Sequence, residues 1–279
     1  MTKTVAQAML AKVYAEKEVQ DYDKVIAYAE KVMNTTGVEL EDSYETLWGY
    51  DETAKDCMKR NTKEGILEVH WTTGSGNWET WMYGRPLDDW DYYFTWAKWI
   101  TPSRDIINAF DKEGDEVRKN QAIVYYACTW SNYYPASNYP FMYKLRSSYN
   151  NIYWIRLADI ILMKAEAEAY KGNLDESAKL VNQIRKRAKL KDLTSDKTNT
   201  KEAMIEAVLH ERRLELAFEG ERWFDLCRNN KVEKYLNGID NRDNGRIKQV
   251  KLFDSNSYLL PIPQTALDQN INLKQNPGY

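Results

Sequence analysis

Apolar residues at helical spacing near the N-terminus predict a helical hairpin over residues 3–35. The first helix has an apolar face formed by Ala6, Met9, Leu10 and Val13. The second helix has an apolar face formed by Val25, Ile26, Ala29 and Val32. Between them lies Asp21, a residue type whose side chain accepts hydrogen bonds from the first backbone N–H groups of a helix. We therefore expect the second helix to begin at Asp21.

The same pattern recurs 152 residues further along the chain, counted from Ala6 to Ala158. Its two apolar faces comprise Ala158, Ile161, Leu162 and Ala165, then Ala178, Val181 and Ile184. Gly172 is expected to end the first helix, and Asn173 with Glu176 has the spacing of a capping box at the start of the second. Both hairpins are about 34 residues long with alanines at the expected contacts, which favours tetratricopeptide-like packing. Two ordinary helical hairpins are the alternative.

Residues 37–151 have a different character and predict a long, irregular insertion that contains short strands. Gly65–Trp71 alternates weakly, as a strand does, and Ile100–Phe110 resembles a short helix that begins at Thr101 and Pro102. The remainder is rich in Gly, Asn, Ser, Tyr and Trp. A third helical region spans 201–235, where Gly220 either bends one helix or separates two. The predicted fold is therefore mainly α, and long loops of this kind are usually functional.

The densest group of charges lies between His210 and Arg228. Glu219, Arg222, Asp225 and Arg228 recur every three residues with alternating sign, so one continuous helix would carry them as a ladder of ion pairs. A glycosidase would instead need two carboxylates at a defined separation, one of them with a raised pKa. Glu211, Glu215 and Glu219 share a helix face, but we expect Arg212, Arg213 and Arg222 to keep them ionised. The pattern favours a structural ion-pair network over catalysis.

Composition narrows the possible functions. A net charge of -3 with mixed signs gives no field that would attract nucleic acid. The three cysteines, at 57, 128 and 227, are odd in number and far apart, and His70 and His210 have no ligand-spaced partner, so we expect neither a disulfide framework nor a zinc site or other cofactor. We expect no signal peptide in this chain and no membrane span.

Six of the ten tryptophans lie between Trp71 and Trp99. Sugars present apolar C–H faces ringed by hydroxyl groups, so a site for them needs aromatic platforms beside planar polar side chains. This window offers both, and we expect a glycan platform formed by Trp71, Trp78, Trp81, Tyr83, Arg85, Asp88, Trp90 and Tyr92. A second aromatic run gives the secondary candidates Trp130, Tyr133 and Tyr134. The alternative is that these rings form core, as we expect for Trp96 and Trp99.

Four blocks in the last half of the chain carry a family resemblance. They are 156–167 (RLADIILMKAEA), 182–185 (NQIR), 211–228, and the closing PIP at 261–263 with QNPGY at 275–279. In order and spacing the chain resembles the SusD/RagB family of outer-membrane nutrient-binding lipoproteins. The segments 64–68 and 102–118 are similar to its middle region with less specificity. The resemblance implies one SusD-like domain over 1–279, with a helical repeat at 1–36, a ligand-binding portion at 37–151 and a signature region at 152–279.

The resemblance also implies a role, which is non-catalytic capture of glycans at the cell surface for a SusC-like TonB-dependent transporter. Family precursors begin with a lipoprotein signal and a lipid-modified cysteine, which this chain lacks, so we expect an N-terminally shortened form whose only membrane anchor would be that missing lipid. A helical-repeat module that binds a protein or peptide is the alternative function. A glycoside hydrolase is a third, which lacks an identifiable carboxylate pair.

Overall fold

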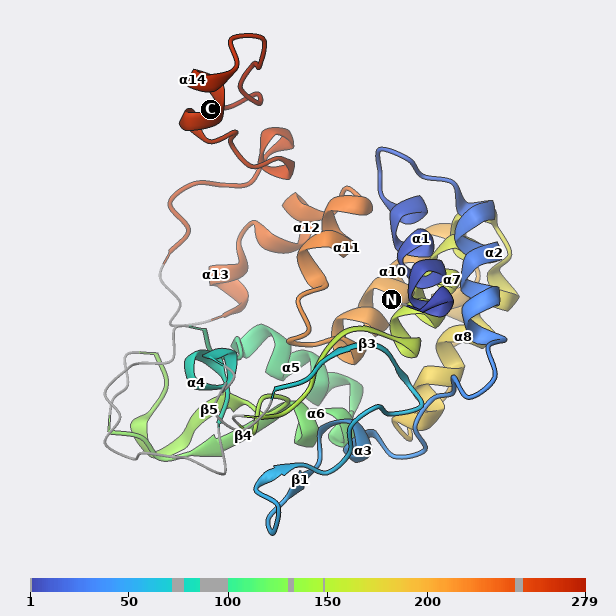
Figure 1. The fold of residues 1–279 in the computed structure, drawn as a ribbon, viewed down its shortest axis with the longest axis vertical. Coiled ribbons are helices and arrows are strands. Elements are labelled where there is room, and N and C mark those ends of the chain that lie inside the picture. Colours follow the sequence, from blue (N-terminus) through green and yellow to red (C-terminus); the bar gives the residue numbers. More distant parts are fainter. Residues whose placement is uncertain (1, 72–77, 86–99, 130–132, 148, 244–247) are drawn as a thin grey trace. The chain divides into compact units, whose positions relative to one another are not determined.

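The structure is a computed structural model that describes residues 2–71, 78–85, 100–129, 133–147, 149–243 and 248–279 (Figure 1). The chain forms two compact units, residues 1–222 and 223–279. About half of the chain is helical, and the strands are few and short, which confirms the predicted mainly α fold. Among the described helices, none combines the length and the apolar composition that crossing a bilayer requires.

Helices packed in succession form the larger part of the first unit. α1 (Lys3–Ala15) packs on α2 (Tyr22–Met33), α2 packs on α7 (Leu157–Lys171), and α7 packs on α8 (Leu174–Arg187) and α10 (Lys201–Glu215). Both predicted hairpins are present. Asp21 caps α2 as expected, because its side chain accepts a hydrogen bond from Lys24 N at 3.1 Å.

The predicted apolar face of α1 is wrong. The helix buries Val5, Ala8, Ala11 and Ala15, whereas Met9, Leu10 and Val13 are exposed. α1 carries apolar residues on two faces, so their periodicity did not identify the packed one. The packed face is the one with alanines, whose small side chains let neighbouring helices approach closely.

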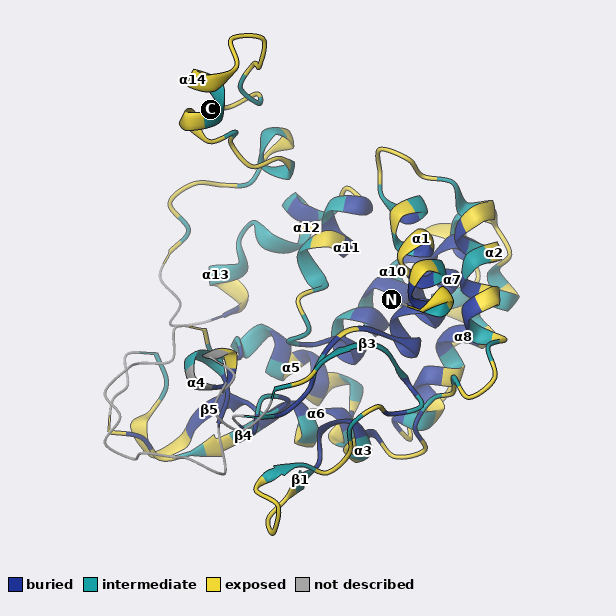
Figure 2. Cartoon of the chain, in the orientation of Figure 1, coloured by how far each residue is buried: buried dark blue, intermediate teal, exposed yellow. Residues whose placement is uncertain are grey.

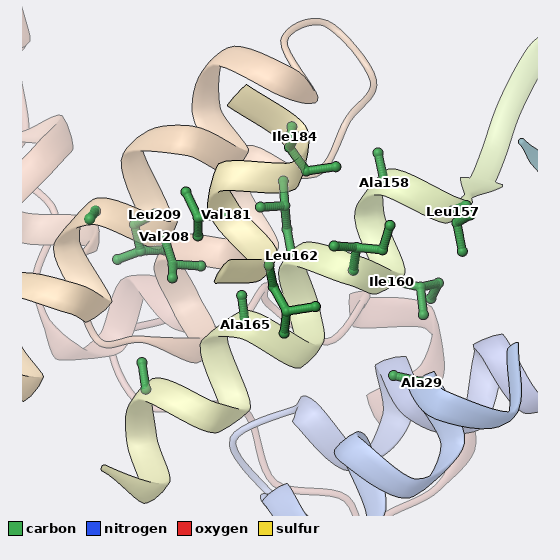
Figure 3. Packing of buried hydrophobic residues seen from close by; sticks show 14 of the residues in the cluster. Ala29, Leu157, Ala158, Ile160, Leu162, Ala165, Val181, Ile184, Val208 and Leu209 are labelled. Carbon is green, nitrogen blue, oxygen red and sulfur yellow. The ribbon is translucent and has the colours of Figure 1, made fainter. Parts of the chain in front are cut away.

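α7 is the centre of the main hydrophobic core. It is buried at every position from Leu157 to Ala169, and Figure 2 shows it in the colour of buried residues. In Figure 3 the side chains of Leu162, Val181 and Val208 gather between α7, α8 and α10. Each fully buried aliphatic side chain of this size contributes about 1.5–3 kcal/mol. This core fixes the helices that carry the charged residues described below.

The junction between α7 and α8 differs in part from the prediction. Gly172 ends α7 in the left-handed conformation, with φ of 85°, as expected. Asn173 occupies the N-cap position of α8 but makes no side-chain cap. Its side-chain amide instead donates to Glu168 Oε2 at 2.7 Å. The predicted capping box is therefore wrong, because a neighbouring carboxylate binds the Asn173 side chain.

The segment between the hairpins forms short elements, as predicted. The helices are α3 (Tyr44–Trp48), α4 (Trp78–Tyr83), α5 (Arg104–Glu113) and α6 (Glu116–Ala122), with the 3-10 helix η1 (Ala136–Asn138). Within the described residues, the strands form three antiparallel pairs, β1 (Tyr50–Asp51) with β2 (Asp56–Cys57), β3 (Gly65–Val69) with β6 (Ile152–Arg156), and β4 (Ile123–Tyr126) with β5 (Tyr139–Met142). α5 begins after Ser103, whose hydroxyl accepts from Ile106 N, and not at Pro102.

The sequence left open whether Gly220 bends one helix or separates two. This glycine has a φ of 88° and lies between α10 and α11 (Arg222–Arg228), so it separates two helices. The remaining short elements are α9 (Ser195–Thr198), α12 (Val232–Leu236), α13 (Ile239–Arg242), η2 (Ser255–Tyr258) and α14 (Gln264–Gln269). Within the second unit, the rings of Trp223 and Phe253 lie 5.8 Å apart.

Candidate ligand-binding site

The carboxylates of α10 form a buried ion-pair network with arginines from other elements. Glu215 is fully buried and lies 2.6 Å from Arg156 Nη1 of β6 and 3.1 Å from Arg118 Nη1 of α6, and it also pairs with Arg187 of α8. Arg118 binds Glu211 at 2.7 Å, and Arg156 binds Glu64 at 2.8 Å. Four elements that are distant in sequence are thus held together by charge-assisted hydrogen bonds.

The predicted ladder along one helix is wrong. Glu219 lies in the turn after α10, where it binds Arg156 Nε at 2.6 Å and Lys144 Nζ at 2.5 Å. Asp225 and Arg228, both in α11, pair with each other at 2.8 Å. The arginines expected to neutralise the glutamates also bind elsewhere, since Arg212 binds Asp159 and Arg213 binds Asp105, each at 2.7 Å. The turn at Gly220 breaks the helical register on which the ladder depended.

The arginines of the network keep the carboxylate of Glu215 ionised. Burial raises the pKa of Glu215, but the positive charges of Arg187, Arg156 and Arg118 outweigh burial and hold this pKa well below its ordinary value. A general acid in glycoside hydrolysis needs the opposite shift. The ion-pair interpretation of the charged stretch therefore holds, although with other partners than those expected.

Tyrosines and arginines cluster around the β4–β5 pair. We call Arg85, Arg104, Tyr126, Tyr133 and Tyr134 the Arg–Tyr cluster. The guanidinium carbon of Arg85 lies 4.3 Å from the ring centroid of Tyr126 on β4. That of Arg104, at the start of α5, lies 4.4 Å from the ring of Tyr133 and 4.1 Å from that of Tyr134. A ring face left free can pack on the apolar face of a sugar, and a neighbouring guanidinium group can donate hydrogen bonds to sugar hydroxyls.

Aromatic packing and backbone contacts position this cluster. Tyr134 packs edge to face on Tyr139 with ring centroids 5.8 Å apart, and its hydroxyl donates to Pro102 O at 2.7 Å. Arg104 Nη2 donates to Tyr133 O at 2.6 Å. These bonds tie the loop before β5 to the start of α5. Tyr133 and Tyr134 are each half-buried, so their rings are anchored and still accessible.

Gly84 allows α4 to approach the segment after β5. It forms an isolated bridge with Met142, and a Cβ atom on Gly84 would lie 2.1 Å from Leu145 O. The next residue, Arg85, donates its backbone N–H to Leu145 O at 2.9 Å. Close approach at a glycine therefore places α4, which carries Trp78 and Trp81, beside the Arg–Tyr cluster.

The structure describes only part of the predicted platform. Trp78 and Trp81 lie in α4, Trp71 and Tyr83 are half-buried, and Arg85 is buried with 8% of its surface exposed. Asp88, Trp90, Tyr92 and Trp130 lie outside the described residues, as do Trp96 and Trp99. Of the two candidate groups, Arg85 stacks on Tyr126, and Tyr134 packs against the same buried cluster as Tyr126. Arg104 and Tyr126 were not predicted as site residues, although the adjacent Tyr125 and Tyr126 of β4 were a usable signal.

Comparison with known proteins identifies the family. The sequence model described as "SusD family" matches residues 39–279, which is most of the chain. The chain belongs to the SusD family. The match includes the charged stretch, the network partners Arg118, Arg156 and Arg187, and the described Arg–Tyr cluster. It confirms the resemblance carried by the four sequence blocks.

Relatives within the SusD family are longer than this chain. The SusD-like protein P38 of Formosa agariphila is 40% identical over 135 residues, which cover 46% of this chain and 25% of that protein. A crystal structure of a SusD superfamily protein from Bacteroides vulgatus is 25% identical with a TM-score of 0.73, and the match covers all of this chain and 63% of the other. A laminarin binding SusD-like protein is 23% identical with a TM-score of 0.71 and the same coverage. This chain thus spans a quarter of the curated relative and under two thirds of the solved chains.

Proposed function

We propose that this protein binds glycans without cleaving them, at the surface of the outer membrane, and delivers them to a SusC-like TonB-dependent transporter. Membership of the SusD family supports a role in surface nutrient capture. A laminarin binding protein and a surface glycan-binding protein A from Bacteroides thetaiotaomicron share its fold. For the membrane association and the transporter partner, the support is membership of the family.

The observation that carries this proposal is the stacking of arginines on half-buried tyrosines beside the tryptophan-bearing helix α4. The Arg–Tyr cluster spans rings from β4 and from the loop before β5, and Gly84 holds α4 next to it. Several aromatic contacts in series favour an oligosaccharide over a single sugar, because each ring contributes only about 0.5–1.5 kcal/mol beyond area burial.

Two features of the charged network support binding without catalysis. Glu215 is fully buried, and its pKa lies well below the ordinary value, so it cannot donate a proton to a glycosidic oxygen near neutral pH. Glu64 and Glu211 are also fully buried and bind arginines, which leaves them without access to a polysaccharide chain.

Affinity electrophoresis in gels that contain polysaccharides tests the proposal. Trp78→Ala combined with Trp81→Ala should abolish retardation by the bound glycan while the melting temperature stays nearly unchanged. Trp154→Ala is a matched control, since Trp154 lies on β6 with 64% of its surface exposed. Retained retardation together with a large loss of stability in the double variant would show that Trp78 and Trp81 form core, and would contradict the proposed platform.

The transporter partnership needs its own test. The protein should co-purify with a SusC-like TonB-dependent transporter expressed in the same cells, and release of reducing sugar from the captured glycan should not exceed that of a buffer control. Absence of the transporter from the purified complex, or release of sugar, would contradict the corresponding half of the proposal.

A further inference from the structure

A cavity, which we call the α6 pocket, opens among three elements of the first unit. Its volume is about 430 Å³, and its lining includes Tyr44 and Glu45 of α3, Val117, Asn120 and Gln121 of α6, and Arg187 at the end of α8. Small-molecule sites typically measure ~300–1,000 Å³. No member of the Arg–Tyr cluster lines this cavity, so it is distinct from the proposed aromatic platform.

The amide side chains of the α6 pocket have unused hydrogen-bonding groups. Gln121 Oε1 accepts from Arg146 Nη1 at 3.0 Å, which fixes the orientation of the amide. Its NH2 group makes no hydrogen bond to any residue that the structure describes, and neither does the side chain of the exposed Asn120. Two amides on adjacent positions of α6 therefore offer donors and an acceptor to an occupant.

Arg187 gives independent evidence for an oxygen-bearing occupant. Its side chain is 5% exposed, and its two terminal nitrogens bind the carboxylates of Glu64 and Glu215. Its Nε–H is buried with no acceptor among the described residues. An unsatisfied buried N–H group is unfavourable, so an oxygen atom from a bound molecule would stabilise this site.

The charges around the pocket select a neutral molecule. Glu64 and Glu215 already neutralise Arg187, and the carboxylates of Glu45 and Glu116 make no ion pair within the described structure. The ammonium group of Lys189 is the only lining cation, among described residues, without an ion-pair partner. Two open carboxylates against one ammonium disfavour an anion, while hydroxyl groups can donate to carboxylates and accept from amides.

We infer that the α6 pocket binds one neutral sugar unit, at the end or on a side branch of the captured glycan. The amides of Asn120 and Gln121 and the Nε–H of Arg187 donate to sugar oxygens, the carboxylates of Glu45 and Glu116 accept from sugar hydroxyls, and Val117 contacts a C–H face. This inference rests on the proposed glycan-binding function and adds a subsite for a single unit.

Amide chemical shifts of the isotopically labelled full chain, titrated with glucose, galactose, mannose and xylose, test this site. At least one of these sugars should perturb the backbone amides of α6. Asn120→Ala should weaken that binding about tenfold, the loss expected from one hydrogen bond. Asn120→Trp should abolish it by filling the cavity, and should fold normally because Asn120 is exposed. Gln183→Trp, at an exposed glutamine of α8 outside the pocket, is the matched control.

Three results would overturn the inference: no perturbation of α6 by any of the four sugars, wild-type binding by Asn120→Trp, or tighter binding of glucuronate than of glucose. The test is separable from that of the main proposal. Monosaccharide shifts at α6 that persist in a protein unable to bind any polysaccharide would contradict the proposed function and support the pocket. Polysaccharide retention without chemical-shift changes in α6 would support the proposed function and contradict the pocket.

Discussion

Replacing Glu215 by glutamine should destabilise the first unit severely. The side chain is fully buried and pairs with Arg118, Arg156 and Arg187, with two of the distances at 3.1 and 2.6 Å. Glutamine keeps the volume but removes the charge and directs an NH2 group at arginine donors. Breaking a buried pair by removing one partner costs about 3–5 kcal/mol. For a unit of this size, each kcal/mol lowers the melting temperature by about 2–4 °C, so we expect a decrease of about 6–20 °C.

Urea unfolding followed by circular dichroism, together with differential scanning fluorimetry, measures this loss. Glu202→Gln is the control, because Glu202 is exposed in the first turn of the same helix, and it should change stability by less than about 0.5 kcal/mol. A loss below about 1 kcal/mol for Glu215→Gln would refute the view that this network clamps the fold.

Two further predictions concern the backbone near the platform and the response to acid. Gly84→Ala should displace α4 from the segment after β5, because the added Cβ would meet Leu145 O at 2.1 Å. We expect weaker glycan retention together with a lower melting temperature. Unchanged values for both would contradict the described contact. The hydrogen bond from His210, with the charge of Arg185, lowers the pKa of Glu113 from 4.5 to about 2. Because this folded-state pKa is depressed, the stabilisation is present above pH 4.5 and is lost as the pH falls towards 2. The unfolding free energy measured across this range should decline less steeply in Glu113→Gln than in the wild-type protein. An equal slope in both proteins would exclude this contribution.

Local helical signals in the sequence predicted the scaffold well. The apolar spacing around Ala158 and Leu162 and the stop at Gly172 are consequences of backbone geometry, so they are visible without a structure. The packed face of α1 was not predictable, because that helix is apolar on two faces. The ion-pair partners were not predictable either, since Arg118 and Arg156 are 97 and 59 residues from Glu215 and only the tertiary fold brings them together.

For the candidate site too, the sequence predicted some residues, and the tertiary fold was needed for the others. Composition alone drew attention to the tryptophan window. Of the candidates, Arg85 stacks on Tyr126, and Tyr134 stacks with Arg104. The contact of Arg104 with Tyr133 depends on the start of α5 after Ser103 and on a loop 29 residues later in the chain. The α6 pocket is assembled from α3, α6 and α8, and no local pattern relates residues 44, 120 and 187.

Titration calorimetry of the full chain against laminarin and a set of soluble neutral polysaccharides tests the central claim most directly. Non-catalytic glycan binding predicts saturable heat with at least one polysaccharide, loss of that heat in the Trp78→Ala and Trp81→Ala double variant, and an unchanged polymer length after the titration. No heat with any polysaccharide, or a continuous heat accompanied by shortened polymer, would contradict it.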